Sequence, residues 1–246
     1  VTYRSAVGMV GYIVLDRPDC QFAAKEVMSK TQEPRKLDWM RLLRLGKFLF
    51  SHPELEWVFP AQDTPGRYVV FGDSDWGGSE SRRSTSGTFE QLGTHPIDYS
   101  CSTQHVIALS SGEAELYATG RAAAGGLQSV QFLAEAGLQL KLEILTDSTA
   151  NIGMHSRIGS GRVRHLDVKW LWTQEAMQAG RFTLKKVDTT ENISDLTTKY
   201  HDELRLKALM KLGGLRYTRG RNIAVLEVIT SRTTGVNGIV SATGSK

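Results

Sequence analysis

Apolar side chains along the first sixty residues recur at a spacing that is typical of helices. Three helices are predicted, over residues 4–14, 21–29 and 37–50. A turn at Arg17-Pro18-Asp19 separates the first two, and a proline three residues beyond the third ends that helix. Residues 1–60 are therefore expected to form a small helical region, followed by a linker over residues 61–66 that is rich in turn-forming residues.

The third predicted helix carries two rows of side chains. Its apolar row, which falls near a period of 3.6 residues and is expected to face a core, consists of Leu37, Met40, Leu43 (or Arg44) and Phe48. Its basic row consists of Arg41, Arg44 and Lys47. The basic row is interpreted either as a solvated face or as a row that contacts phosphate groups, and the pattern leaves both open.

From residue 67 the pattern changes to short apolar runs bounded by Gly, Ser and Thr, which is typical of strands. Three antiparallel strands are predicted, over residues 67–73, 87–92 and 97–102. The chain then alternates between a helix over 110–136 bent near Gly125-Gly126, a strand over 141–146, helices over 148–156 and 165–179, a strand over 181–187, and a last helix over 193–200 with a continuation to 212.

This order of elements predicts an α/β fold over residues 67–212. We expect one mixed five-stranded sheet, with three antiparallel strands followed by two parallel strands, and helices on both faces. Beyond it, residues 213–246 are rich in Arg, Thr, Gly and Ser. They are expected to be a poorly ordered extension with one strand over residues 223–229.

Composition excludes some classes of protein. The 246 residues are 40% apolar, which is enough to bury the core of one large domain or two small ones. No apolar run is long enough to span a bilayer and no signal peptide is evident, so no membrane contact is expected. Cys20 and Cys101 lack a metal-ligand spacing and are expected to be reduced, as in an intracellular protein. The net charge of +4 is compatible with nucleic acid binding without establishing it.

Acidic residues stand where the predicted strands end. Asp73 and Asp147 each follow a strand, and the ends of neighbouring strands lie side by side, although Asp147 is also well placed to cap the next helix. Asp75 shares a face of the strand with Asp73 but lies further into the loop, so Asp73 is favoured. Asp195 opens the last predicted helix, where it either joins this group or complements the helix dipole.

Glu113 and Glu115 are about 200° apart around a helix, so only one of them can face the sheet. The residues one turn away from Glu115 are small and allow close approach to a sheet: Ser111, Ala118, Thr119 and Ala122. Glu115 is therefore the inward carboxylate, and Glu113 is expected in a flanking or solvated position. Four crowded carboxylates raise one another's pKa values unless cations neutralise them, and oxygen ligands without Cys or His favour Mg²⁺ or Mn²⁺. Two such ions would promote phosphodiester hydrolysis.

A series of motifs runs in order along residues 2–200. They are Tyr3-Arg-Ser-Ala-Val-Gly8, Arg17-Pro-Asp19, Gly72-Asp-Ser-Asp-Trp76, Arg82-Arg-Ser-Thr-Ser-Gly87, Ala108-Leu-Ser-Ser-Gly-Glu-Ala-Glu-Leu-Tyr117, Thr146-Asp147, Arg164-His-Leu-Asp167 and Ser194-Asp-Leu-Thr-Thr-Lys199. Each motif is modest, but all of them in this order are specific. With them the chain resembles the end of the Pol polyprotein of copia-type LTR retrotransposons.

The resemblance implies an RNase H-like domain that begins near Arg67, preceded by the end of a reverse transcriptase (its thumb or connection region). It implies hydrolysis of the RNA strand of RNA–DNA hybrids with two Mg²⁺ ions, or Mn²⁺ as an alternative. The family's four catalytic and metal-binding acids fall on Asp73, Glu115, Asp147 and Asp195.

The same resemblance implies contacts to the hybrid from Arg82, Arg83, Ser84, Ser86, Ser110 and Ser111. For Ser110 and Ser111, simple capping of the helix is an equal alternative. A basic stretch is a candidate to follow the DNA strand: Arg157, Arg162, Arg164, His165 and Lys169.

The polymerase palm with its Asp-Asp motif is absent, so no polymerase activity is expected. The implied partners are the RNA–DNA hybrid and the missing reverse transcriptase domain. The implied location is intracellular, in cytoplasmic virus-like particles, with the nucleus as an alternative. Two alternative functions stay open: an inactive fragment that only binds nucleic acid or its polymerase partner, and an integrase or transposase of the same fold. The position of Glu115 on the first long helix argues against the second.

Overall fold

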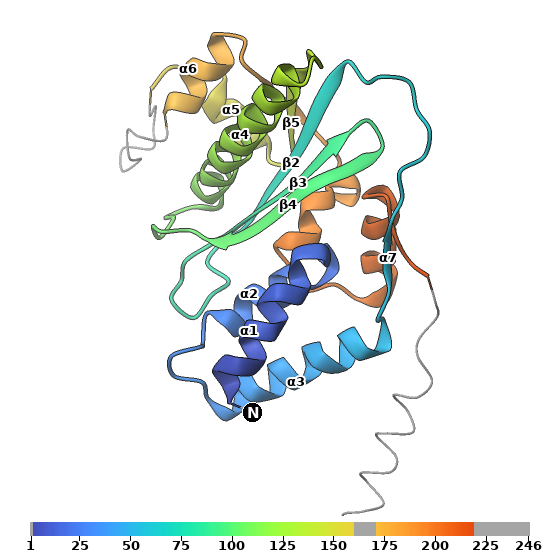
Figure 1. The fold of residues 1–246 in the computed structure, drawn as a ribbon. Helices are drawn as coiled ribbons and strands as arrows, with labels where there is room; N and C mark the ends of the chain where they lie inside the picture. The colour runs from blue at the N-terminus through green and yellow to red at the C-terminus, as the bar shows by residue number, and fades with distance from the viewer. Residues whose placement is uncertain (1, 160–170, 219–246) are drawn as a thin grey trace, which may run out of the picture.

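A mixed five-stranded sheet lies at the centre of the computed structural model, which describes residues 2–159 and 171–218 (Figure 1). Its strands are β2 (Arg67–Asp75), β3 (Thr85–Leu92), β4 (His95–Thr103), β5 (Lys141–Thr146) and β6 (Thr183–Lys186), in the order β4-β3-β2-β5-β6. The first three pair antiparallel, whereas β5 pairs parallel with both β2 and β6. The predicted fold class is confirmed, including three antiparallel strands followed by two parallel ones.

Helices cover both faces of this sheet (Figure 1). On one side lie α4 (Ser111–Glu135), α5 (Thr149–His155) and α6 (Trp172–Gln178); on the other lie a 3₁₀ segment, η5 (Ile193–Thr197), and α7 (Glu203–Leu212). Successive side chains of β2 point to opposite faces of the sheet, as strand geometry requires. Val70 packs in the cluster under α4, while Phe71 packs in the cluster with Leu209 of α7.

The long helix α4 runs without interruption through Gly125-Gly126, so the predicted bend is wrong. Gly126 has a different role. A Cβ atom on this residue would lie 2.7 Å from Cδ1 of Leu142 and 2.9 Å from Cγ2 of Val70. The absence of a side chain therefore lets the helix backbone lie directly on β2 and β5.

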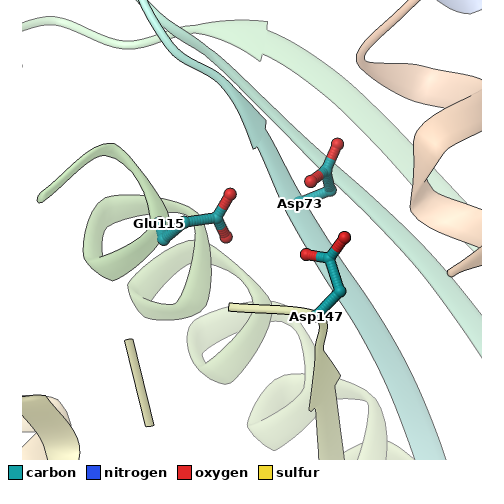
Figure 2. Close-up of side chains that lie close together, drawn as sticks. All are labelled: Asp73, Glu115 and Asp147. Atoms are coloured by element: carbon teal, nitrogen blue, oxygen red, sulfur yellow. The ribbon is translucent and has the colours of Figure 1, made fainter. Parts of the chain in front are cut away.

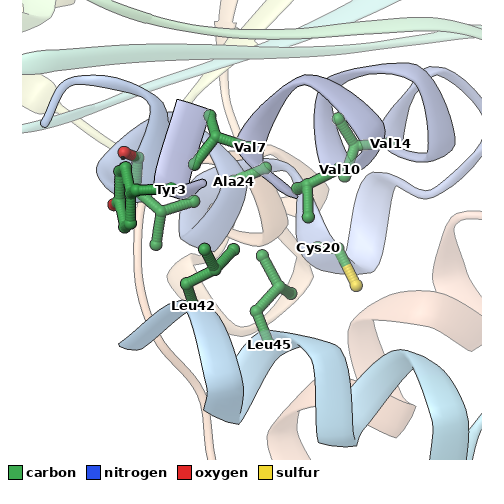
Figure 3. Packing of buried hydrophobic residues seen from close by; sticks show 9 residues of the cluster. Tyr3, Val7, Val10, Val14, Cys20, Ala24, Leu42 and Leu45 are labelled. Atoms are coloured by element: carbon green, nitrogen blue, oxygen red, sulfur yellow. Dashed lines mark hydrogen bonds between the residues drawn. The ribbon is translucent and has the colours of Figure 1, made fainter. Parts of the chain in front are cut away.

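The first three helices are α1 (Tyr3–Ile13), α2 (Gln21–Met28) and α3 (Lys36–Ser51), and they enclose a core of their own (Figure 3). The predicted buried row of α3 is wrong for three of its members, because Leu37, Met40 and Leu43 are 49–59% exposed. Leu42 and Leu45 are buried in their place. Apolar residues lie all around α3, so its periodicity alone does not indicate which face α1 and α2 cover.

Two short strands were missed by the sequence analysis. β1 (Leu55–Trp57) lies within the region expected to be helical, and β7 (Leu215–Tyr217) lies within the extension expected to be poorly ordered. They pair antiparallel with each other across about 160 residues of chain. The predicted last helix also differs, because residues 193–197 form the 3₁₀ segment and α7 begins separately at Glu203, capped by Asp202.

The helical region and the sheet are in direct contact. Tyr99 on β4 donates its hydroxyl to the carbonyl of Val14 at 2.8 Å, and Lys25 on α2 donates to the Thr85 hydroxyl at 2.8 Å. Tyr217 on β7 reaches back to Asp19 at 2.9 Å. The boundaries at residues 60–67 and 212–213 stay predictions, and these contacts show that the segments on either side pack together.

The predicted strand over 223–229 and the start of the predicted helix over 165–179 lie outside the described residues. Both cysteines, Cys20 and Cys101, are free thiols, in agreement with the sequence. Among the described helices, none combines the length and apolar character that crossing a membrane requires.

Two leucines of α7 provide a test of how this helix packs. Leu209 has 0% of its surface exposed within the core beneath the sheet, whereas Leu204 is 83% exposed. We expect Leu209→Ala to lower the free energy of unfolding by about 2–5 kcal/mol, because it removes apolar contacts and leaves a cavity. Leu204→Ala is the matched control and should change it by less than about 0.5 kcal/mol. Urea unfolding measures both, and equal effects would contradict the packing of α7.

Candidate metal centre

The parallel pairing of β2 and β5 brings two aspartates to the same edge of the sheet. Phe71 pairs with Leu145 in this register, so Asp73 within β2 and Asp147 just beyond the end of β5, each two residues further on, lie at the same level. Glu115 reaches the same point from the second turn of α4. Carboxylate oxygens of the three residues lie within 4.8 Å of one another (Figure 2). We call Asp73, Glu115 and Asp147 the carboxylate triad.

Small residues let Glu115 come this close to the sheet. Ala118 and Ala122 on α4 are fully buried, and a Cβ on Gly72 would already lie 3.4 Å from Cβ of Ala122. The predicted close approach of α4 is therefore confirmed. Since only small side chains lie between the helix and β2 at this level, the carboxylate of Glu115 projects toward Asp73 (Figure 2).

The two oxygens of Glu115 have different surroundings. Oε1 accepts hydrogen bonds from the backbone N–H of Ser74 at 3.3 Å and from its hydroxyl at 2.9 Å. Oε2 is buried and has no hydrogen-bond partner among the described residues. A buried carboxylate oxygen without a partner destabilises the folded state, because it has lost its hydrogen bonds to water and forms none with the protein. Such an atom, aimed at two further carboxylates, fits a bound cation.

The electrostatics of the triad indicate the same need. Burial raises the pKa of Glu115 to about 8, and the neighbouring charge of Asp73 adds to this. Burial also raises the pKa of Asp73 to about 6, although the ammonium of Lys199 partly opposes the shift. Both carboxyl groups therefore resist ionisation until positive charge is brought to them.

Asp195 lies beside the triad rather than within it. Its Oδ1 accepts from Nζ of Lys199 at 2.7 Å, and its Oδ2 accepts from Nη2 of Arg205 at 2.9 Å. Nζ of Lys199 also lies 3.1 Å from Oδ2 of Asp73. Burial acts to raise the pKa of Asp195, but the bond to Lys199 and the charges of its cationic neighbours outweigh it and lower the pKa. One lysine thus links the fourth acid to the triad.

The segment that carries Asp195 is fixed closely against β3. A Cβ on Gly87, the residue that pairs with Asp73, would lie 2.2 Å from Oγ1 of Thr197 and 2.5 Å from Cγ2 of Thr198. Thr198 in turn donates its hydroxyl to Oδ2 of Asp73. Only glycine leaves room for η5 at this point, so Gly87 sets the distance between Asp195 and the triad.

Two further acids were weighed in the sequence. Asp75 is half-buried and lies outside the triad, which agrees with the preference for Asp73. Glu113 is not solvated: it is 3% exposed, and its carboxylate accepts from the backbone N–H of Leu109 at 2.8 Å and from the hydroxyl of Tyr117. It secures the start of α4 and leaves Glu115 as the inward acid. The alternative role of Asp147 as a helix cap is wrong, because Ser148 caps α5.

Only some of the residues expected to contact a hybrid are exposed to solvent. Arg82 and Arg83 are exposed in the turn between β2 and β3, and Ser111 is exposed at the start of α4. Ser84 is fully buried, and its hydroxyl accepts from the backbone N–H of Gly77 at 3.1 Å. Ser110 caps α4 through the N–H of Glu113 at 3.2 Å. Ser86 is also buried and accepts from Gln104. Arg162, Arg164, His165 and Lys169 lie outside the described residues.

Lys199 and Arg205 were missed as part of this site. The sequence does contain a signal for Lys199, because a lysine four residues after an aspartate is a common ion-pair spacing. For Arg205 the spacing of ten residues gives no such signal, since α7 must first fold back toward η5. In the folded chain, the guanidinium of Arg205 on α7 also donates to the backbone carbonyls of Thr190 at 2.5 Å and Thr189 at 2.7 Å. These bonds hold Arg205 beside η5.

The basic row of α3 lies near this region. Arg41 and Arg44 line a cavity of about 400 Å³ together with Lys199, Tyr200 and His201. His201 also contacts the backbone carbonyl of Asp195 at 2.9 Å through Nε2. Two members of the row therefore face a hollow beside the acid cluster.

No family model matches the chain. It is 27% identical over 206 residues to the retrovirus-related Pol polyprotein from transposon RE2 of Arabidopsis thaliana, a match that covers 80% of this chain and 14% of that protein. It is 26% identical over 229 residues to the corresponding polyprotein from transposon TNT 1-94 of Nicotiana tabacum, covering 87% of this chain and 16% of that protein. The chain thus spans about a seventh of the length of these relatives.

A shorter relative is the secreted RxLR effector protein 161 of Plasmopara viticola, 35% identical over 124 residues, which are 50% of this chain and 87% of that protein. Among solved structures, an RNase H1 isolated from compost has a TM-score of 0.41 at 13% identity and covers 54% of this chain and 93% of its own. The protease–reverse transcriptase of prototype foamy virus has a TM-score of 0.36 at 10% identity and covers 74% of this chain and 28% of its own.

The similarity to the two transposon polyproteins covers 80% and 87% of the chain. The sheet has the mixed five-stranded order expected of an RNase H-like domain. The homologues of this chain are retrovirus-related Pol polyproteins from transposons.

Proposed function

We propose that this chain is a metal-dependent endonuclease that hydrolyses the RNA strand of RNA–DNA hybrids. The observation that carries the proposal is the carboxylate triad, where Asp73, Glu115 and Asp147 converge from two parallel strands and a helix. Unlike many acidic surface clusters, the triad is largely buried, and Oε2 of Glu115 is without a partner among the described residues. Its all-oxygen donor set fits Mg²⁺, with Mn²⁺ as the alternative.

Within this proposal each residue has a definite task. Ser74 orients the carboxylate of Glu115 through two hydrogen bonds, and Thr198 orients that of Asp73. Asp147 supplies the third carboxylate from the end of β5. A divalent ion bound there would polarise the scissile phosphate and lower the pKa of an attacking water. The expected products carry 5′-phosphate and 3′-hydroxyl ends.

The exposed basic turn supports a nucleic acid as the substrate. Arg82 and Arg83 lie between β2 and β3, and β2 carries Asp73, so a phosphate backbone bound by this turn is led toward the triad. Ser111 is exposed at the start of α4, where hydroxyl and N–H groups suit a ribose 2′-hydroxyl or a phosphate. The buried Ser84 and Ser86 have structural hydrogen bonds instead, and they are not part of the proposed contact surface.

The helical region supports a second, compatible role in binding the remainder of a Pol polyprotein. Several of its large apolar side chains are 49–79% exposed: Met9, Tyr12, Leu37, Met40 and Leu43. An exposed apolar surface of this kind is typical of a protein contact. A fragment that binds nucleic acid or its polymerase partner without cleaving would share this surface, and the two functions differ in whether the triad is used.

The first test is cleavage of an end-labelled RNA–DNA hybrid in Mg²⁺, with single-stranded RNA and duplex DNA as control substrates. We expect the wild type to cut only the hybrid. Asp147→Asn should reduce the rate more than about 100-fold, because a metal ligand is lost. The matched control is Asp63→Asn, which neutralises an exposed aspartate outside the centre and should leave the rate unchanged. Undiminished cleavage by Asp147→Asn would refute the proposal, and hybrid binding without cleavage by the wild type would favour the binding function.

A second test concerns pH and needs no substrate. Without divalent ions, the free energy of unfolding should fall as the pH rises from about 4.5, the ordinary pKa of a glutamate, to about 8, the pKa of buried Glu115. Over this range the folded protein retains a proton that the unfolded chain has lost, so rising pH favours unfolding. Glu115→Gln should flatten this dependence, because an amide does not ionise.

Urea unfolding in EDTA at several pH values measures this effect. Glu33→Gln, which neutralises an exposed glutamate, is the control and should keep the wild-type slope. Saturating Mg²⁺ should reduce the slope in the wild type, since a bound cation offsets the charge of the ionised carboxylates. Identical slopes for Glu115→Gln and the wild type in EDTA would show that Glu115 is not buried in its carboxyl form.

A further inference from the structure

One ammonium group already lies within the acid cluster. Nζ of Lys199 is 3.1 Å from Oδ2 of Asp73 and 2.7 Å from Oδ1 of Asp195. The side chains of the two aspartates are only 2% and 6% exposed, so most of their contacts are with protein rather than with water. The lysine therefore lies where an ion shared by Asp73 and Asp195 would have to bind.

The other partners of these aspartates leave little room for such an ion. Oδ2 of Asp195 accepts from Arg205, whose guanidinium is fixed by two backbone carbonyls. Oδ2 of Asp73 accepts from both Thr198 and Lys199. Both oxygens of Asp195 are thus bound to cationic side chains, in contrast to Oε2 of Glu115, which is buried without a partner among the described residues.

The charges of the cluster also favour one divalent ion at the triad and protein cations beside Asp195. The four carboxylates carry four negative charges when ionised, and the ammonium of Lys199 and the guanidinium of Arg205 neutralise two of them. The two that remain equal the charge of one divalent cation. A second divalent ion would have to displace the ammonium and give up part of its own hydration, which Mg²⁺ does reluctantly.

We propose that Lys199 is a resident cation of this centre: the protein binds one divalent ion at the carboxylate triad, and the ammonium of Lys199 supplies the second positive charge between Asp73 and Asp195. This replaces the expectation of two ions drawn from the sequence. Any effect of Lys199 on hydrolysis depends on the proposed nuclease function. The number of divalent ions that the protein binds does not depend on it. Its side chain is 40% exposed, so the ammonium is accessible from solvent as well as from the two carboxylates.

The test is the number of Mn²⁺ ions bound by the full chain, from the electron paramagnetic resonance signal of free Mn²⁺ in a titration without nucleic acid. We expect one ion for the wild type and two for Lys199→Met, because the variant exposes a pair of carboxylates without their cation. Lys199→Arg retains the charge and should bind one ion. Asp147→Asn should weaken the single site of the wild type at least tenfold.

The matched control is Lys207→Met. Lys207 is also a lysine paired with a carboxylate four residues earlier, Glu203 at 2.6 Å, but it lies on the exposed side of α7. This variant should bind one ion, as the wild type does. If Lys199→Met fails to fold, as judged by circular dichroism, Lys199→Gln replaces it, because the amide keeps a hydrogen-bond donor while removing the charge.

The inference is overturned if the wild type binds two ions or none at saturation, or if the uncharged variants at position 199 still bind one. Cleavage of the RNA–DNA hybrid is measured separately on the same samples. One ion in the wild type and two in Lys199→Met, with no cleavage by the wild type, would refute the proposed nuclease while leaving the resident cation in place. Cleavage by a wild type that binds two ions would refute the resident cation and leave the proposed nuclease in place.

Discussion

The burial of three carboxylates at one point is the constraint on which the rest of this structure depends. The parallel register of β2 and β5 places Asp73 and Asp147 at the same level, and the small residues of α4 bring Glu115 to them. Without compensation, burial and the repulsion between neighbouring charges make such a cluster take up protons, as the raised pKa values of Asp73 and Glu115 indicate. When these carboxyl groups are ionised, the sheet edge therefore requires positive charge, from a bound ion or from the protein.

The C-terminal part of the described chain provides this charge from the opposite face of the sheet. η5 packs against Gly87 of β3, and α7 packs into the apolar cluster beneath the sheet through Leu209. These contacts fix the backbone that carries Lys199 and Arg205, so the position of the two cations follows from core packing as well as from charge. The pairing of β1 with β7 then ties the end of this segment to the helical region. The site is formed by residues far apart in the sequence, and the contacts that hold it together also join segments far apart in the sequence.

Local patterns were sufficient to predict the sheet and the convergence of Asp73, Glu115 and Asp147 at its edge. The strands are short apolar runs bounded by glycine and polar residues, and Glu115 is identified by the small residues one turn away. Where the sequence was misleading, a tertiary contact decided the outcome. Leu37 and Met40 are as apolar as Leu42 and Leu45, and only the position of α1 and α2 selects which pair is buried. Gly125-Gly126 suggested a bend because glycine weakens helices, yet Gly126 serves a close contact with β2 and β5.

Asp195 shows why a complete set of acids does not by itself specify a metal site. Its place in the sequence motif is intact, and it lies beside the triad, but both of its oxygens are bound to cationic side chains. A motif records which residues are present, whereas the number of ions depends on which carboxylate oxygens are still without a positive partner after folding. The spacing of Asp195 and Lys199 predicts no more than a local ion pair. It becomes a bridge to the triad because Thr198 and Gly87 hold this segment against Asp73, a residue more than a hundred positions earlier in the chain. The charge of the centre is thus set by the packing of η5 on β3, which no local pattern contains.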